Sequence, residues 1–137
     1  MLMQLNKVKY DELNDKQKEN YNYSKVSSAL AEYGYNCIKL ADDYKGADFI
    51  AMHINGMDSI MIQLKGRWTI AKKYIGKNLY VAYPEHNNDS IWLFNHDDMV
   101  QNCSEHVNYL SSKSWDVEGA YSSASHPKKL ESLMTRL

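Results

Sequence analysis

Two short segments of the sequence hold the residues best suited to chemistry. They are GADFIA at 46–51 and IQLKGR at 62–67, and a polar stretch separates them. Interpreted as neighbouring strands of a hairpin, they bring Asp48, Gln63 and Lys65 together at one end. An acid, an amide oxygen and a lysine are the minimum set for metal-dependent hydrolysis of a phosphodiester. Oxygen donors hold a hard cation, and the lysine assists the attacking water.

The placement of these side chains depends on the loop of the hairpin. If the loop runs from Asn55 to Asp58, Asp48 lies opposite Lys65, whereas a loop of only two residues puts Asp48 opposite Gln63. Directly opposed residues share a face, and so do residues two apart on one strand. Both loops therefore place the three side chains on one face, and a loop of odd length would separate them. A structural salt bridge between Asp48 and Lys65 satisfies the same spacing, so both interpretations stay open.

The elements that must position this hairpin follow from the hydrophobic periodicity. A helix is predicted over 14–33, with Asn14 or Asp15 as its N-cap and Gly34 as the residue that ends it. Five strand candidates follow: 35–41, 48–54, 59–65, 78–83 and 90–94. Pro84 is expected to stop the fourth strand. Both faces of the hairpin carry apolar residues, so we expect both faces to be covered.

The C-terminal third has a weaker pattern. We expect a short helix over 95–103 and a loop with fragments of structure over 104–126. A C-terminal helix is predicted over 127–137, with Pro127 at its first position. No internal repeat and no linker divides the chain, so residues 1–137 are assigned to one domain.

Charge is distributed unevenly along the chain. The net charge of −1 argues mildly against a general nucleic-acid coat protein. Between Gln63 and Asn78, however, the sequence has no acidic residue and contains Lys65, Arg67, Lys72, Lys73 and Lys77. Such a block can neutralise phosphates, and its alternative interpretation is a solvated loop.

The composition fits a folded domain, with 44% hydrophobic and 24% charged residues in 137. The N-terminal residues lack an apolar signal core, and no run reaches the roughly 18 apolar residues of a membrane span, so a cytoplasmic location without membrane contact is expected. Cys37 and Cys103 have no metal-type spacing, and we interpret both as free thiols.

The order of helix, strand, GADFIA strand and a strand ending in IQLKGR resembles the PD-(D/E)XK nuclease superfamily, including small bacterial members with a Gln-x-Lys motif. The resemblance covers roughly residues 14–84. It implies an α/β fold of the restriction-endonuclease type, with an αβββαβ core and a mixed sheet.

The resemblance also implies roles for particular residues. Asp48, the Gln63 amide oxygen and the Leu64 backbone carbonyl would hold Mg²⁺ or Mn²⁺, and Lys65 would lie near the attacking water. Glu19 is the candidate for the helix acid found in this superfamily. Arg67, Lys72, Lys73 and Lys77 would hold the phosphate backbone.

The sequence departs from the superfamily pattern in three ways. Gln63 stands where Glu or Asp is usual, which removes one negative charge from the site. Only residues 67–77 separate the third and fourth strands, so the crossover between them is reduced. Glu19 lies well before Gly34, which leaves three substitutes as helix acid: Glu32, Asp42 and Asp43.

The sequence therefore favours a metal-dependent endonuclease acting on double-stranded or branched DNA, as a monomer or a homodimer. Two alternatives remain. The first is a catalytically degenerate nuclease fold that only binds nucleic acid, and the second is a protein-interaction accessory factor.

Overall fold

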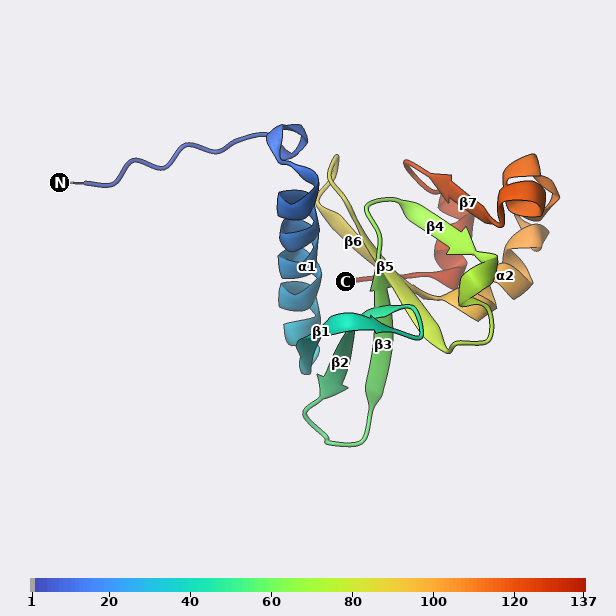
Figure 1. Cartoon of the computed structure of the whole chain (residues 1–137), viewed down its shortest axis with the longest axis horizontal. Coiled ribbons are helices and arrows are strands. Elements are labelled where there is room, and N and C mark those ends of the chain that lie inside the picture. Colours follow the sequence, from blue (N-terminus) through green and yellow to red (C-terminus); the bar gives the residue numbers. More distant parts are fainter. Residues whose placement is uncertain (1) are drawn as a thin grey trace.

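In the computed structural model, which describes residues 2–137, one long helix packs on a six-stranded mixed sheet (Figure 1). The strands lie in the spatial order β1 (Tyr35–Tyr44), β2 (Ala47–His53), β3 (Ser59–Leu64), β5 (Leu79–Glu85), β6 (Ser90–Asn95) and β8 (Thr135–Arg136). Only β3 and β5 pair in parallel, and the other neighbours are antiparallel. The mixed α/β class expected from the sequence is confirmed.

Helix α1 (Asp15–Ala31) begins and ends where its capping residues predict. The Asn14 side chain accepts a hydrogen bond from the Gln17 backbone N–H at 2.8 Å, and the Gln17 side chain accepts one from the Asn14 N–H at 2.9 Å. This capping box satisfies two of the free N–H groups of the first turn. At the other end Gly34 has a φ of 84°, a left-handed conformation that costs least at glycine.

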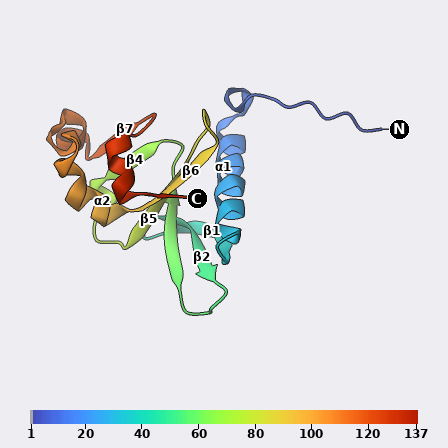
Figure 2. The same cartoon turned by 180° about the vertical axis from the view of Figure 1, so that it is seen from behind.

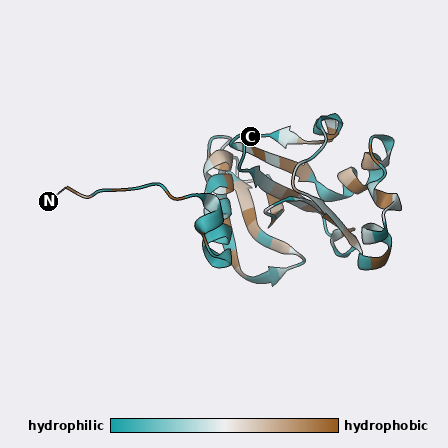
Figure 3. Cartoon of the chain, turned by 90° about the horizontal axis from the view of Figure 1, so that it is seen from above, coloured by the Kyte–Doolittle hydropathy of each residue, from teal (hydrophilic) through white to brown (hydrophobic). Residues whose placement is uncertain are grey.

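The helix covers one face of the sheet. Val26 and Leu30 of α1 pack with Phe49, Ala51 and Ile62 of the hairpin in one buried cluster. In Figure 3 the ribbon of α1 is mostly hydrophilic, because only this stripe of the helix contacts the strands. The alternation predicted for β2 and β3 therefore holds on the α1 side.

The opposite face of the hairpin is only partly covered, contrary to the expectation from the sequence. Met61, which pairs with Ile50 on this face, packs against Tyr74 and Leu79 near one end of the hairpin. Towards the turn, however, Met52 is 43% exposed and Ile54 is 78% exposed. The cover of this face therefore ends before the hairpin turn.

The β2–β3 register pairs Phe49 with Ile62 and Met52 with Ser59, and the pairing ends at Phe49 and Ile62, next to Asp48 and Gln63. This is the second of the two registers considered from the sequence. The turn nevertheless spans residues 54–57, since the His53 N–H donates to the Asp58 carbonyl oxygen at 2.9 Å. Both loops considered from the sequence were therefore wrong in detail, but the even number of turn residues preserved the predicted parity of the paired residues.

The connection between β3 and β5 contains no α-helix. It consists of strand β4 (Trp68–Ala71) and a single 3₁₀ turn, η2 (Lys72–Tyr74). Strand β4 pairs with β7 (Ala120–Ser123) in a separate two-stranded sheet. The reduced crossover is confirmed, whereas a plain loop over 104–126 was incomplete because this segment also supplies β7 and several helical turns.

The predicted C-terminal helix is wrong. Residues Lys128–Leu133 form a 3₁₀ helix, and Thr135–Arg136 then pair with β6. The Leu137 N–H donates to the Ile91 carbonyl oxygen at 2.9 Å, which extends this pairing to the chain end. The strand is favoured because β6 would otherwise leave unpaired backbone groups at the edge. Figure 2 shows the red C-terminal segment reaching this edge.

A second core fills the face of the sheet away from α1. Helix α2 (His96–Asn102) contributes Met99, which packs with Trp68, Trp92 and Phe94. His96 is fully buried, and its Nε2 accepts a hydrogen bond from the Ala71 N–H at 3.0 Å. This bond ties α2 to the end of β4, next to η2.

Strand β5 continues through Pro84, which was expected to stop it. Pro84 pairs with Ile91 of β6, but β3 ends at Leu64 opposite Ala82. Pro84 therefore lies beyond the last β3 pair, where its missing N–H leaves no bond unmade on that side.

Within residues 2–137, no helix combines the length and apolar character that crossing a membrane requires.

Candidate functional site

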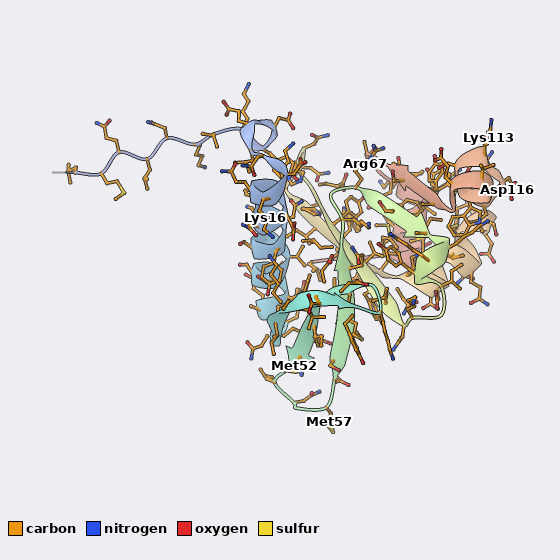
Figure 4. The ribbon with its side chains drawn as sticks, in the orientation of Figure 1. Lys16, Met52, Met57, Arg67, Lys113 and Asp116 are labelled. Atoms are coloured by element: carbon orange, nitrogen blue, oxygen red, sulfur yellow. The ribbon has the colours of Figure 1, made fainter. Side chains whose placement is uncertain are left out.

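The three candidate catalytic residues lie at the end of the β2–β3 hairpin that is remote from its turn. Met57 marks the turn in Figure 4, whereas Asp48 is the second residue of β2, Gln63 is the second-last residue of β3 and Lys65 directly follows β3. The Lys65 N–H donates to the Ala82 carbonyl oxygen of β5 at 2.9 Å. Pairing with β5 from Gln63 to Lys65 therefore fixes the backbone of the Gln-x-Lys segment.

Asp48 is held by the backbone of the neighbouring strand. Its Oδ2 accepts a hydrogen bond from the Leu64 N–H at 2.8 Å. Burial raises the pKa of Asp48 above its ordinary value. The Leu64 N–H and the Lys65 charge act in the opposite direction, and the charges of Glu19 and Asp43 raise the pKa further. In residues 2–137 Asp48 forms no ion pair, so its negative charge is only partly compensated.

A cavity of about 280 Å³ lies between α1 and the end of the hairpin, and we call it the α1 pocket. It is lined by Glu19, Tyr23, Lys39, Asp48, Gln63 and Leu64. Glu19 thus reaches the same pocket as Asp48 and Gln63, although it is near the N-terminal end of α1. The other acids considered for this position do not line the α1 pocket. Glu32 lines a different hollow beside Asp89.

An adjoining hollow of about 710 Å³ lies on the other side of Asp48 and Gln63, and we call it the lysine groove. It is lined by Asp43, Lys45, Gly46, Asp48, Gln63, Lys65, Lys73, Tyr74 and Lys77. Four lysines outnumber two aspartates, so the groove attracts anions. The Nζ atoms of Lys65 and Lys73 lie 5.3 and 5.2 Å from the centre of the Tyr74 ring. Cation–π attraction of this kind holds both ammonium groups over the groove.

The basic block of the sequence does not act as one surface. Lys73 and Lys77 line the lysine groove. Lys72 points elsewhere, with its Nζ 5.7 Å from the centre of the Trp115 ring and 3.5 Å from the Asp116 carbonyl oxygen. Arg67 lines a separate cavity beside Tyr10 and His86.

Sequence reasoning missed two lysines of the site. Lys39 lies opposite Phe49 on β1 and so shares the face that α1 covers. Lys45 follows β1 in a tight turn, with a φ of 53°. The signal for Lys39 was its alternation with Cys37 on β1, but only the position of α1 shows where that face leads. No sequence signal marked Lys45.

The donors around the α1 pocket fit a hard divalent cation. Residues 2–137 contain no group of three or more His, Cys, Asp or Glu side chains arranged to hold a metal ion. The available set is instead mixed, with the carboxylates of Glu19 and Asp48, the amide of Gln63 and the carbonyl of Leu64. All four supply oxygen, the ligand that Mg²⁺ and Mn²⁺ prefer. The raised pKa of Asp48 identifies a carboxylate that a nearby cation would stabilise.

The Gln63 side chain is in direct contact with one of these oxygens, the Leu64 carbonyl. Its Nε2 lies 3.4 Å from the Leu64 carbonyl oxygen, to which it donates. Rotation of the amide by half a turn would exchange its nitrogen for its oxygen and direct an acceptor to the same place. Gln63 can therefore serve as a donor to the backbone or as an oxygen ligand.

Comparison with solved structures places this arrangement on a known type of fold. The chain is similar to a bacterial homing endonuclease, I-Ssp6803I, with a TM-score of 0.50 and 10% sequence identity over 85% of this chain and 79% of that one. At this identity the likeness concerns the fold alone, which is a nuclease-like α/β fold. Neither a protein-family model nor a curated protein sequence matches the chain.

Proposed function

We propose that the protein is a divalent-metal-dependent endonuclease of the PD-(D/E)XK superfamily that hydrolyses phosphodiester bonds in DNA. The observation that carries this proposal is the shared wall between two hollows. Asp48 and Gln63 line both the α1 pocket, with its oxygen donors, and the lysine groove, with its excess of positive charge. Candidate metal ligands therefore lie at the border of a surface suited to an anionic backbone.

The oxygen donors have distinct roles in this proposal. Asp48, Gln63, Leu64 and Glu19 would hold Mg²⁺ or Mn²⁺ through their side-chain oxygens and, for Leu64, the backbone carbonyl. When bound, such an ion polarises the phosphoryl oxygen and stabilises the charge on the leaving oxygen. The Leu64 N–H keeps Asp48 oriented through Oδ2, which leaves the other carboxylate oxygen for the ion.

The lysines would act on the substrate. Lys65 would orient the attacking water by donating to its oxygen and would offset the charge of the phosphate, since its ammonium is held over Tyr74 beside Asp48 in the same groove. Lys45, Lys73 and Lys77 would hold phosphate oxygens without reading the base sequence. We leave Lys72 and Arg67 out of this set because they line neither hollow.

The test is a cleavage assay in Mg²⁺ and in Mn²⁺ with plasmid, branched and single-stranded DNA. Lys65→Ala should lower metal-dependent cleavage by about 100-fold or more, the range attributed to the loss of one donor that stabilises the transition state. Thermal unfolding of the variant should match that of the wild type, because Lys65 is not part of the buried core.

Lys113→Ala is the matched control, since this exposed lysine lies at the far side of the molecule from α1 and lines neither hollow (Figure 4). It should keep full activity, whereas Asp48→Ala should be as inactive as Lys65→Ala. Unchanged cleavage by Lys65→Ala would exclude the proposed role of this lysine.

One observation favours a second candidate, a nucleic-acid-binding module without cleavage. The α1 pocket contains two carboxylates and one ammonium, and the neutral Gln63 stands where the superfamily usually has a third carboxylate. This low negative charge reduces the attraction for a divalent ion. DNA binding that persists without any saturable Mn²⁺ site would support the module instead of the enzyme.

The proposal also has a consequence for assembly. A copy with one such site would cut one strand at a time, so concerted cleavage of both strands of a duplex would take two copies. Sedimentation of the protein with and without duplex DNA measures whether it pairs.

A further inference from the structure

Lys39 is the one positive side chain among the six residues that line the α1 pocket. Its Nζ lies 3.9 Å from Oε1 of Glu19 and 3.3 Å from Oδ1 of Asn20, both on α1. The same Nζ lies 5.4 Å from the centre of the Tyr23 ring. Three groups of one helix thus hold the ammonium inside the wall of the pocket.

Glu19 is shared between two lysines. Lys16 approaches the same Oε1 at 3.6 Å from one turn earlier on α1. The Lys16 side chain is 70% exposed and lies outside the pocket, whereas that of Lys39 is 41% exposed and lines it. Lys16 is therefore a neighbour of Glu19 without access to the space that an ion would occupy.

We propose that Lys39 is a built-in counter-cation of the α1 pocket, which competes with a divalent ion for the carboxylate of Glu19. This inference rests on the proposed function, since it assigns Glu19 to the metal-binding set. An ion that takes Glu19 as a ligand must displace the ammonium, or be repelled by it at close range. Lys39 thereby lowers the affinity of the protein for the ion without touching the substrate.

The pair of lysines supplies the test. Mn²⁺ affinity is measured by calorimetric titration of the full chain, without DNA, for the wild type, Lys39→Met and Lys16→Met. Methionine retains an unbranched apolar chain against Tyr23 and removes the ammonium, with its charge and its hydrogen bond to Asn20. Lys39→Met should bind Mn²⁺ about 3- to 10-fold more tightly, because the competing pair is partly exposed and therefore weak. Lys16→Met should stay within about twofold of the wild type.

A double variant shows whether the effect passes through Glu19. In the background of Glu19→Gln, the affinity gain from Lys39→Met should mostly disappear, because Lys39 then has no carboxylate to compete for. A gain that persists in full without the Glu19 charge overturns the inference. Thermal unfolding of Lys39→Met, with Lys39→Gln as a second neutral variant, verifies that the helix still packs on β1.

The outcomes separate this inference from the proposed function. Mn²⁺ binding that Asp48→Asn abolishes, together with equal or weaker affinity in Lys39→Met, overturns the role of Lys39 alone. No saturable Mn²⁺ binding in either the wild type or Lys39→Met overturns both proposals. Binding that appears only in Lys39→Met supports the inference in its strongest form.

Discussion

Asp48 combines two requirements that usually oppose each other. A carboxylate needs hydrogen-bond donors to remain charged in a half-buried position, yet a metal ligand needs free oxygens. The hydrogen bond from the Leu64 N–H satisfies one oxygen, and the raised pKa shows that the charge is still undercompensated. Asp48 therefore carries an energetic cost in the metal-free protein.

Removing this charge should stabilise the metal-free protein. Asp48→Asn keeps an oxygen that can accept the Leu64 N–H and should raise the free energy of unfolding at pH 7 by roughly 0.2–1 kcal/mol, the range of single partly screened charges. Thermal unfolding in a chelator measures the gain.

The pH dependence has a definite sign. Because the folded pKa is raised, the folded state binds the proton more tightly, and stability falls as pH rises through the window between the ordinary aspartate pKa and the raised one. The advantage of Asp48→Asn should therefore be complete above this window and vanish below it. An advantage independent of pH would contradict the electrostatic explanation.

At the residue scale, the sequence predicted that Asp48, Gln63 and Lys65 lie together, but it could not show which of the other lysines line the lysine groove. Parity alone put Asp48 and Gln63 together, because a strand has only two faces. Lys72 and Lys73 are adjacent in a 3₁₀ turn, where successive side chains point about 120° apart. The exact start of that turn decides which of the two enters the groove, and spacing does not determine it.

At the element scale, α1 connects the stability of the fold to the site, since Glu19 is five residues beyond the N-cap Asn14. Asn14→Ala should remove the capping bond and lower the free energy of unfolding by about 1 kcal/mol. Chemical denaturation measures the loss, and Asn87→Ala, at an exposed loop position, is the control with no expected change. Equal losses in the two variants would show that the cap does not matter.

The elements themselves were predicted unequally. Helix α1 and the first strands have local signals, such as Asn14, Gly34 and the alternation around Phe49. The C-terminal segment was mistaken for a helix because Leu130 and Leu133 are three residues apart, a spacing that a 3₁₀ helix satisfies as well. Its last residues form a strand because of the open edge of β6, a partner that is distant in the sequence.

At the scale of the whole molecule, the lysine groove should determine how affinity for DNA depends on salt. Lys73→Ala should weaken binding to any duplex and lower the slope of log affinity against log salt by about one, as expected for one lost phosphate contact. Lys72→Ala should leave the slope unchanged, because its ammonium lies over Trp115. Fluorescence anisotropy over a range of salt concentrations measures both, and equal slopes for the two variants would contradict the assignment of the groove.

The two edges of the six-stranded sheet differ from its interior strands. Strand β1 forms one edge, and its register shifts between Lys39 and Tyr44, which interrupts the row of free backbone groups. Strand β8 forms the other edge with only two residues. Neither edge offers an unbroken template onto which a second sheet could be added, so the architecture resists aggregation by strand addition.

Ile38 and Met52, which are 50% and 43% exposed on the face away from α1, instead offer side chains for contact between faces. If two copies assemble, we expect the contact at the faces of the sheet and not at its edges.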